Sequence, residues 1–302
     1  MDSPKRQDSW AIATYLRVKP TFQPKHKDID YHIQGMSSTN YDPHLNYSVL
    51  TLNLDHIDVR ISDGGSRSII DLVIPPDADP GLIHNNSATG RLKFEFDRVF
   101  NSETTQEELY DIVVKEKILG LIDGFSCTVF AYGQTGSGKT YTIFGGESFA
   151  ERGLIPRSLG SLFSELKIKK QKIPSFAFRC QVSFTEIYKE TVYDLLEQNR
   201  TSLIREEWTP VQLLDSVNGL VLKNLSVYDV ESEEEALQLF FMGNNTRITT
   251  ATSMNSVSSR SHAVFTLLLD SEGIKIDQTV FTSSKINLVD LAGSERMYKV
   301  IL

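Results

Sequence analysis

Apolar and polar residues alternate along several short segments of the first hundred residues, as they do in half-buried β-strands. The segment 10–20 predicts a strand that stops at Pro20, and the segment 48–61 predicts a strand or a hairpin. Another strand is predicted at 91–100. Residues 75–90 are rich in proline, glycine and asparagine, which predicts a loop.

From residue 105 the apolar residues take the spacing of a helix. Thr105 and Glu108 match a capping box, in which each side chain binds a free backbone N–H group of the first turn. Apolar residues then recur on one face as far as Ile122, and Gly124 can close the end. The pattern therefore predicts a helix over 105–123.

A second capping box, Ser232 with Glu235, predicts a helix that carries apolar residues and ends at Gly243. The short basic run 167–172 predicts a solvated loop, with a contact to a partner as the alternative.

Four further segments have the composition of strands. Residues 127–133 are almost all apolar, as in the buried middle of a sheet, and residues 176–188 alternate cleanly. Apolar strands are also predicted at 263–270 and 285–290. Strands that alternate with helices predict a layered α/β fold with a mainly parallel or mixed sheet.

Composition narrows the class of protein. The 302 residues are 40% hydrophobic and 23% charged, so the chain can bury a sizeable core. A net charge of −8 argues against a general nucleic-acid binder, which is usually basic. Cys127 and Cys180 lie in apolar runs and are expected to be buried, reduced thiols. With no signal peptide and no apolar run of about 20 residues, we expect a soluble intracellular protein with no membrane contact.

The segment YGQTGSGKT follows the apolar strand and contains the phosphate-loop pattern G-x-x-x-x-G-K-[ST]. Gly133, Gly136 and Gly138 let the backbone wrap closely around phosphates. Lys139 can reach the terminal phosphates, and Thr140 can offer a hydroxyl ligand to Mg²⁺. A glycine-rich turn without a ligand is the alternative.

Two later segments suit a sensor of the γ-phosphate. The hydroxyls and the arginine of NSVSSRSH, 255–262, can bind Mg²⁺, water and phosphate, with a serine-rich loop as the alternative. In NLVDLAGSER, 287–296, Asp290 ends an apolar strand and suits a water-mediated contact to Mg²⁺. Gly293 can offer its N–H group to the γ-phosphate, and Glu295 can pair with an arginine. The alternative is an ordinary turn, because D-x-x-G is common in turns.

Together the three segments resemble the phosphate loop, first switch and second switch of the kinesin motor domain. FEFDRVF at 94–100 and SFTEIYKETVYDLL at 183–196 are similar to further motifs of that family, and the resemblance covers residues 10–296. It implies a P-loop NTPase of kinesin motor type, in which helices flank a central mixed β-sheet. A myosin-like or other P-loop phosphotransferase is a distant alternative.

The resemblance implies ATP and Mg²⁺ as cofactors and assigns their residues. ATP would contact Arg17, Pro20, Gly133, Gln134, Thr135, Gly136, Ser137, Gly138, Lys139, Thr140, Tyr141 and Asn255. The catalytic residues would be Ser258, Ser259, Arg260, Asp290, Gly293 and Glu295. Mg²⁺ would be held by Thr140, Ser259 and, through water, Asp290.

Within these assignments, Arg260 and Glu295 would form an ion pair between the two switches that closes over ATP. Arg17 and Pro20 would flank the adenine, although the family usually has arginine where this chain has Lys19.

The resemblance further implies a microtubule-dependent ATPase that moves along microtubules in the cytoplasm and cytoskeleton. RVKP, GLIHNN, RGLIPRSL and EEEALQLFFMGNNTR resemble the ciliary ninth family of kinesins, which implies a place in the cilium or flagellar axoneme. A stalk outside this chain would make the parent protein oligomeric.

The family pattern continues beyond this chain, so we expect one incomplete motor domain. It would have a flexible start at 1–9, a core at 10–296 and a divergent tail at 297–302, without the main microtubule-binding helices. The missing last strand would leave unpaired backbone groups beside the phosphate-loop strand, at about 1–3 kcal/mol each. The alternative function is therefore a truncated, motility-deficient nucleotide binder with little or no microtubule-stimulated ATPase.

Overall fold

The computed structural model describes residues 13–19, 49–52, 58–63, 68–73, 91–198, 200, 204–216, 219–252, 260–275 and 278–295. The chain forms two compact units, Met1–Ser102 and Glu103–Leu302, here named the N-terminal unit and the C-terminal unit. Each has buried apolar residues of its own.

The described residues of the N-terminal unit include short strands. Their bounds are β1 Tyr15–Val18, β2 Val49–Leu52, β3 Asp58–Asp63, β4 Ser68–Val73, β5 Arg91–Phe96 and β6 Arg98–Phe100. β1 pairs in parallel with both β2 and β6, while β3, β4 and β5 form an antiparallel sheet. The predicted strands at 10–20 and 91–100 are confirmed where described, and the segment 48–61 contains two strands. The predicted loop at 75–90 lies outside the described residues.

Asp97 separates β5 from β6. Its carboxylate oxygen Oδ2 accepts hydrogen bonds from the N–H of Thr14 at 2.6 Å and from the Thr14 hydroxyl at 3.2 Å. The N–H of Asp97 donates to the Thr14 carbonyl at 2.8 Å. These bonds hold the start of β1 next to Asp97, where β5 ends and β6 begins. β5 pairs with β4, and β6 pairs with β1.

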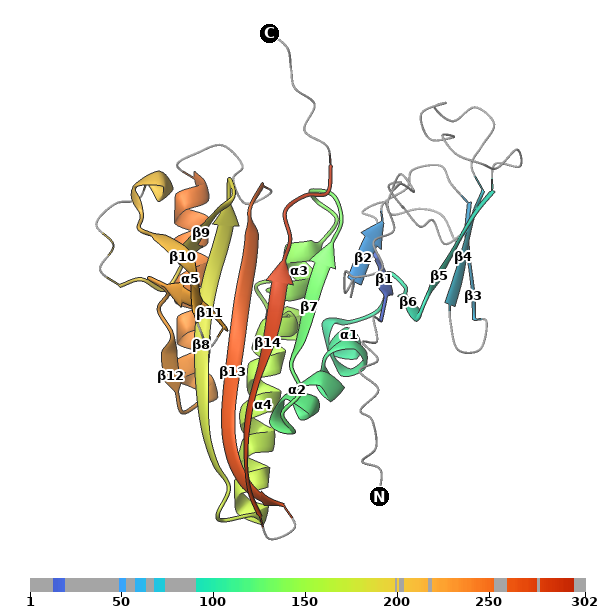
Figure 1. Cartoon of the computed structure of the whole chain (residues 1–302). Helices are drawn as coiled ribbons and strands as arrows, with labels where there is room; N and C mark the ends of the chain where they lie inside the picture. Colours follow the sequence, from blue (N-terminus) through green and yellow to red (C-terminus); the bar gives the residue numbers. More distant parts are fainter. Residues whose placement is uncertain are drawn as a thin grey trace. The chain divides into compact units, whose positions relative to one another are not determined.

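The C-terminal unit contains a mixed sheet with the strand order β11-β10-β9-β8-β13-β14-β7, and β12 also pairs with β8. β7 and β14 are parallel, and the other neighbours are antiparallel (Figure 1). The bounds are β7 Cys127–Tyr132, β8 Ala177–Tyr188, β9 Thr191–Asp194, β10 Pro210–Ser216, β11 Gly219–Lys223, β12 Tyr228–Val230, β13 His262–Lys275 and β14 Gln278–Asp290. The predicted mixed sheet is confirmed.

β13 and β14 are longer than the apolar segments predicted at 263–270 and 285–290. They form one antiparallel hairpin, in which pairing continues from Ala263 opposite Asp290 to Lys275 opposite Gln278. The part of the hairpin near its turn is polar, so an apolar pattern in the sequence does not predict a strand there. Backbone pairing extends the strands past their buried section.

The helices of this unit are α1 Gln106–Val113, α2 Lys115–Ile122, α3 Lys139–Ile143, α4 Leu154–Lys172 and α5 Glu233–Thr252, with 3-10 turns η2 Phe149–Glu151 and η3 Arg205–Glu207. α4 contacts α1, α2, α3 and α5, and Figure 1 shows α4 and α5 behind the strands. Among the described helices, none is long and apolar enough to cross a bilayer.

The predicted helix at 105–123 exists as α1 and α2, which meet at Val114. The capping box is present: the N–H of Glu108 donates to the Thr105 hydroxyl at 3.2 Å, and the N–H of Thr105 donates to the Glu108 carboxylate at 2.9 Å. Gly124 follows α2 with a φ of +96°, a conformation that glycine adopts without strain. The predicted start and end are both confirmed.

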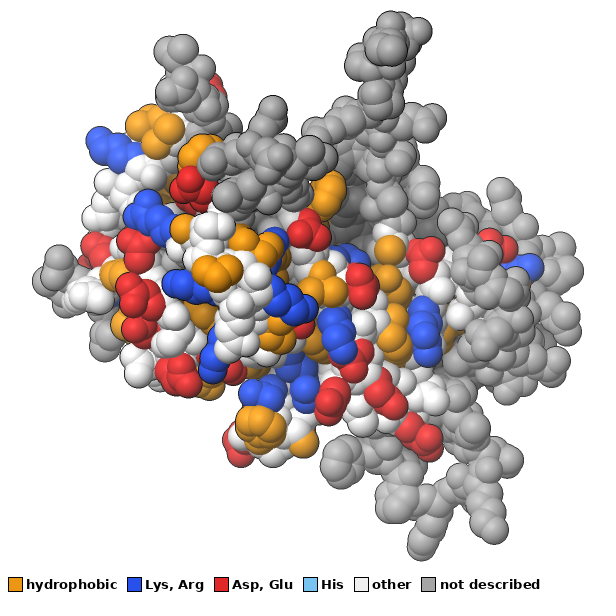
Figure 2. All heavy atoms as spheres, turned by 90° about the horizontal axis from the view of Figure 1, so that it is seen from below, with side chains coloured by type: hydrophobic (Ala, Val, Ile, Leu, Met, Phe, Trp, Pro, Cys, Tyr) orange, Lys and Arg blue, Asp and Glu red, His pale blue; other side chains and the backbone are white. Residues whose placement is uncertain are grey.

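The basic run 167–172 was predicted as a loop, and this is wrong: it forms the last turns of α4. Lysines at a helix C-terminus are favoured because the free carbonyl groups there carry partial negative charge. Lys169 Nζ also donates to the Ile122 carbonyl at 3.2 Å and lies 3.4 Å from Asp123 Oδ1. Seen from below, basic and acidic side chains are interspersed (Figure 2).

Phenylalanine rings from a helix and two strands meet in the core behind the sheet. The ring centroids of Phe184 and Phe265 are 5.3 Å apart, and those of Phe240 and Phe265 are 5.8 Å apart, both edge to face. Phe144, which follows α3, lies 5.5 Å from Phe240. This cluster joins α5 to β8 and β13.

Gly243 does not end the second predicted helix, because α5 continues to Thr252. The prediction used glycine's role as a helix stop, but packing explains this residue. A Cβ atom at Gly243 would overlap the Phe184 ring and lie 3.2 Å from Leu196 Cδ2. The missing side chain lets α5 approach β8 closely. The cap is confirmed in part, since the Ser232 hydroxyl accepts from the N–H of Glu235 at 3.2 Å.

We expect Gly243→Ala to lower the free energy of unfolding by about 1–3 kcal/mol, because the added methyl group overpacks the Phe184 contact. The matched control is Gly120→Ala in α2, where the nearest atom to an added Cβ is Phe125 Cβ at 3.8 Å. That change should stabilise the helix by about 0.5–1 kcal/mol. Urea unfolding measures both, and equal effects of the two substitutions would contradict the packing explanation.

Candidate functional site

The carboxyl ends of β7 and β14 lie side by side. Because the strands are parallel and Ala131 pairs with Asp290, the segments that follow them emerge at the same edge of the sheet. These segments are the glycine-rich loop 133–138 and the loop 291–295. In open α/β sheets, ligands bind at this edge.

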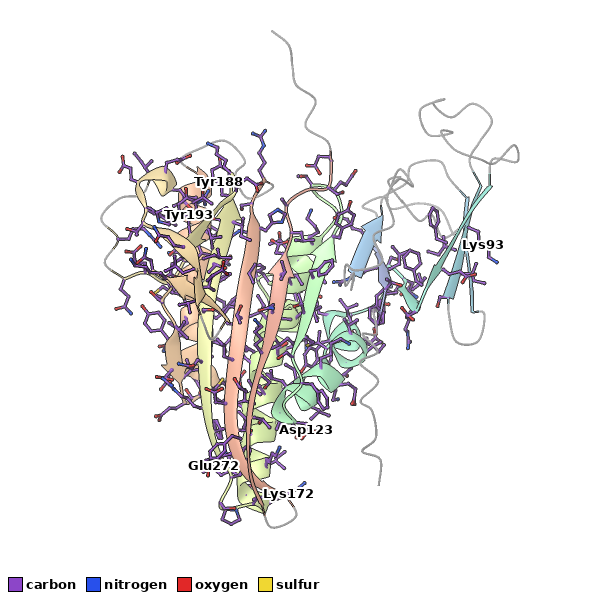
Figure 3. The ribbon with its side chains drawn as sticks, in the orientation of Figure 1. Lys93, Asp123, Lys172, Tyr188, Tyr193 and Glu272 are labelled. Atoms are coloured by element: carbon purple, nitrogen blue, oxygen red, sulfur yellow. The ribbon has the colours of Figure 1, made fainter. Side chains whose placement is uncertain are left out.

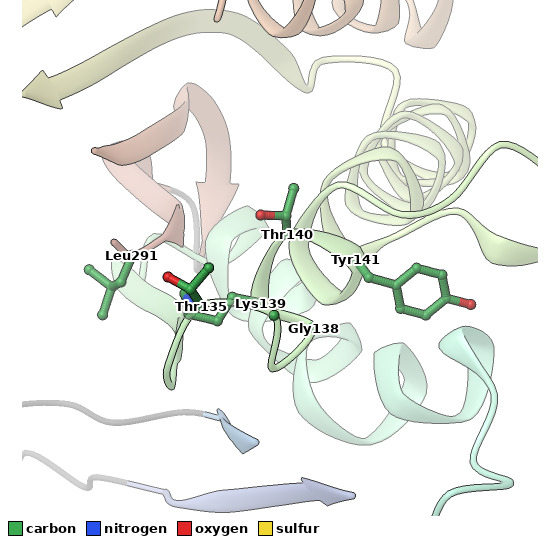
Figure 4. A pocket seen from close by; sticks show the side chains of 7 residues that line it. Thr135, Gly138, Lys139, Thr140, Tyr141 and Leu291 are labelled. Carbon is green, nitrogen blue, oxygen red and sulfur yellow. The ribbon is translucent and has the colours of Figure 1, made fainter. Parts of the chain in front are cut away.

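The glycine-rich loop borders a cavity of about 270 Å³ (Figure 4). Gly136 and Gly138 have φ angles of +80° and +100°, which side chains other than glycine rarely allow. A Cβ at either position would meet no atom within 4 Å, so the backbone here is open to a ligand. The cavity is lined by Thr135, Gly136, Gly138, Lys139, Thr140, Tyr141 and Leu291.

Lys139 is the cation of this loop. It is 7% exposed, and its Nζ donates to the Gln134 carbonyl at 2.8 Å. Burial lowers the pKa of the ammonium group, while the carboxylates of Asp290 and Glu295 act in the opposite direction. The neighbouring Ser137 hydroxyl is buried and has no hydrogen-bond partner among the described residues. The loop therefore holds a cation and a free hydroxyl beside its open backbone.

Asp290 connects the loop to the end of β14. Its Oδ2 accepts from the Thr140 hydroxyl at 2.8 Å and from Arg247 Nη1 at 2.8 Å. Its other oxygen, Oδ1, is buried and has no partner in the part of the chain that the structure describes. Thr140 and Asp290, two of the three predicted Mg²⁺ ligands, thus lie together, and the third, Ser259, lies outside the described residues.

Four hydrogen bonds fix the loop after β14. The N–H of Ser294 donates to the Gly133 carbonyl at 3.1 Å, and the N–H of Ala292 donates to His262 Nδ1 at 3.1 Å. The N–H of Thr135 donates to Glu295 Oε2 at 2.9 Å, and the Thr135 hydroxyl also contacts Glu295. The segment 291–295 of the predicted second switch therefore contacts the phosphate loop directly.

The contact between Thr135 and Glu295 affects two residues of the loop after β14. Burial acts to raise the pKa of the Glu295 carboxyl, but the hydrogen bonds and the charge of Lys139 outweigh it and the pKa is lowered. Gly293 lies so close that a Cβ there would overlap the Glu295 carboxylate and the Thr135 hydroxyl. Only glycine fits beneath this pair of side chains.

Most of the predicted ATP-binding residues lie together at this edge. Tyr141 lines the cavity and is 39% exposed. Arg260 is exposed just before β13, and among the described residues it forms no ion pair with Glu295, whose partner is Thr135. Arg17 is a buried residue of β1 in the N-terminal unit. Outside the described residues are Pro20, Asn255, Ser258 and Ser259.

The sequence motifs missed the charged residues behind Asp290. Arg247 lies in α5, and its partner Glu186 lies in β8, where Val182, Phe184 and Tyr188 share the buried face. The alternation of apolar and polar residues along β8 could have indicated Glu186, because it places this carboxylate on the buried face of the strand. A buried carboxylate requires a partner, but the strand pattern does not identify which residue supplies it.

Comparisons with known proteins agree with this geometry. A family model described as the kinesin motor domain matches residues 69–300. The chain is 35% identical over 246 residues to the kinesin-like protein KIF9 of Homo sapiens, covering 81% of this chain and 30% of that protein. It is 38% identical over 238 residues to the kinesin-like protein KLP1 of Chlamydomonas reinhardtii, covering 78% of this chain and 29% of that protein.

The fold is similar to the solved structure of a fast kinesin. The TM-score is 0.70 at 25% sequence identity, and the match covers 97% of this chain and 68% of that chain. The predicted P-loop fold of kinesin motor type is confirmed. The chain spans about 30% of the length of the curated relatives described above.

His262 predicts a dependence of stability on pH. Burial lowers the pKa of its imidazole, with Arg247 acting in the same direction and Asp290 and Glu190 acting against it. The folded state therefore resists protonation, whereas the unfolded chain takes up a proton near its ordinary pKa of about 6.5. The free energy of unfolding should fall as the pH drops from about 7.5 to about 5.5.

The matched variant is His262→Gln, which does not titrate but keeps an oxygen that can accept from Ala292. Its loss of stability over the same pH range should be smaller than that of the wild type. Denaturant unfolding at both pH values measures the difference. Equal losses would show that another group causes the acid sensitivity.

Proposed function

The chain belongs to the kinesin motor domain family, and on that premise we propose that it binds and hydrolyses ATP and moves along microtubules. The observation that carries the proposal is the 2.8 Å hydrogen bond from the Thr140 hydroxyl to Asp290. It joins the start of α3, directly after the phosphate loop, to the end of β14, as a site that senses a terminal phosphate requires.

ATP would bind with its phosphates at the open loop. A Cβ atom added at Gly136 or Gly138 would meet no atom within 4 Å, so a phosphate can approach this loop, and N–H groups of such loops bind phosphate oxygens. Lys139 would exchange the Gln134 carbonyl for a phosphate oxygen, a better partner for a cation. Tyr141, at the side of the cavity, would lie against the base.

Mg²⁺ fits the oxygen donors of this site. No three His, Cys, Asp or Glu side chains of the described residues gather as metal ligands. Mg²⁺, however, usually takes one or two protein oxygens together with water and phosphates. The Thr140 hydroxyl and, through water, the free Asp290 Oδ1 would hold it, with Ser259 as a further ligand. When bound, Mg²⁺ would neutralise charge on the phosphates.

Hydrolysis would require the second-switch loop to change its partners. Glu295 now accepts hydrogen bonds from Thr135. In the proposed cycle it would pair with Arg260, and together they would orient the attacking water with Ser258. Gly293 would offer its N–H to the γ-phosphate. Arg260 and Glu295 are both exposed, so surrounding packing would not oppose this change of partner.

The partner and location follow from the relatives. The solved fast kinesin is described by its ATPase mechanism and its interactions with microtubules, and by similarity we assign tubulin as the partner of this chain. Similarity to KIF9 and KLP1 supports a cytoskeletal location. A cilium or flagellum is the more specific proposal, with oligomers formed by a stalk outside this chain.

The proposed function is tested by ATP turnover with and without microtubules, in wild type and in Lys139→Ala. We expect stimulation by microtubules in the wild type, and loss of both turnover and binding of a fluorescent ATP analogue in the variant, because the loop loses its cation. Lys115→Ala removes an exposed lysine of α2 and should behave as wild type. Turnover without stimulation would support the motility-deficient alternative, and unchanged binding by Lys139→Ala would refute the assigned loop.

Glu295→Ala separates binding from hydrolysis. The change should spare binding of the ATP analogue and slow turnover by about 100-fold or more, because the attacking water loses its orienting group. Glu272→Ala is the control. This exposed glutamate of β13 lies at the end of the C-terminal unit that is opposite to the phosphate loop (Figure 3). Normal turnover by Glu295→Ala would exclude this residue from the mechanism.

A further inference from the structure

A chain of buried charges extends inward from the site. Arg247 of α5 donates from Nη1 to Asp290 Oδ2 at 2.8 Å, and its Nε lies 3.6 Å from Glu186 Oε1. Arg247 is 3% exposed, Asp290 1% and Glu186 0%. The arginine therefore bridges two carboxylates that lie on different strands, β14 and β8.

Glu186 is itself held by two more groups. Arg205 Nη2 lies 2.7 Å from Glu186 Oε2, and the Ser261 hydroxyl donates to Glu186 Oε1 at 2.5 Å. Arg205 also donates to the Thr250 hydroxyl at 2.8 Å. Its guanidinium lies 5.0 Å from the ring centroid of Tyr188, which Figure 3 labels. The Glu186 end of the bridge is thus fixed from both sides.

Stability alone does not explain this arrangement. The two arginines and two carboxylates balance in charge, but taking such groups out of water costs free energy that their attraction only partly returns. Apolar residues of similar volume would often serve the fold as well. The bridge ends on Asp290, the carboxylate that accepts from the Thr140 hydroxyl. If the bridge serves to position the Asp290 carboxylate, its location directly behind the site is explained.

We propose that Arg247 is a positioning residue for Asp290 and sets its Mg²⁺-binding geometry. This inference rests on the proposed function. A carboxylate is planar, so fixing Oδ2 between Thr140 and Arg247 also fixes where Oδ1 lies. Oδ1 is the buried oxygen without a partner among the described residues, and it is left for the Mg²⁺-bound water. Outer residues of this kind commonly tune metal affinity about 10- to 100-fold.

Two double variants test the inference. Arg247→Met with Glu186→Gln removes one buried cation and one buried anion, and Asp290 loses its arginine. Arg205→Met with Glu186→Gln removes the same charges but leaves the Arg247–Asp290 contact in place. Binding of a fluorescent ATP analogue is titrated with Mg²⁺ for each protein and repeated in EDTA. Thermal unfolding shows whether each variant is folded.

We expect the first variant to raise the Mg²⁺ concentration for half-maximal effect about tenfold or more, with affinity in EDTA unchanged. The second variant should leave the Mg²⁺ requirement as in wild type. If the first variant does not fold, Arg247→Lys replaces it. Lysine keeps the positive charge but lacks the planar guanidinium group, so this variant should also raise the Mg²⁺ concentration for half-maximal effect.

Equal shifts in the two double variants, or no shift when Arg247 is replaced, would overturn the inference while leaving the proposed function intact. A wild type that fails to bind the analogue would overturn the proposed function, and the inference with it.

Discussion

The parallel pairing of β7 with β14 is the constraint on which the candidate site depends. It aligns Ala131 with Asp290, so two segments that are distant in the sequence start at one edge of the sheet. Parallel neighbours cannot be joined by a tight turn and need a long crossover. The chain between them supplies α3, α4 and α5, and α4 contacts both of the other helices. One pairing therefore fixes both the helical layer and the site.

A second constraint is the burial of charge behind that edge. Glu186 takes an inward position among Val182, Phe184 and Tyr188, and Asp290 is equally buried at the end of β14. Each carboxylate requires a partner because an isolated buried charge would cost several kcal/mol. Arg247 meets both requirements from a single helix. The position of α5 against β8, which Gly243 makes possible, is thus coupled to the geometry of Asp290.

The sequence predicts what depends on local pattern. The capping box at Thr105, the apolar strand β7 and the phosphate loop all use residues within a few positions of one another, and the structure contains them. Contacts between residues that are distant in the sequence are not predicted by local pattern. Arg247 and Asp290, for example, are 43 positions apart. Gly243 shows the same limit: glycine suits a helix end or a close contact, and only the opposing Phe184 ring decides between them.

The internal contacts of the loop indicate how the site can respond to a ligand. Lys139 binds the Gln134 carbonyl, and Glu295 binds Thr135, so groups that a phosphate would use are satisfied by neighbours. Each such hydrogen bond contributes only about 0.5–1.5 kcal/mol net, so a charged ligand can replace it at small cost. A phosphate that takes the Thr135 N–H must release Glu295, and with it the end of the loop after β14. Under the proposed function, the contact between Thr135 and Glu295 is therefore one through which a bound phosphate would be sensed.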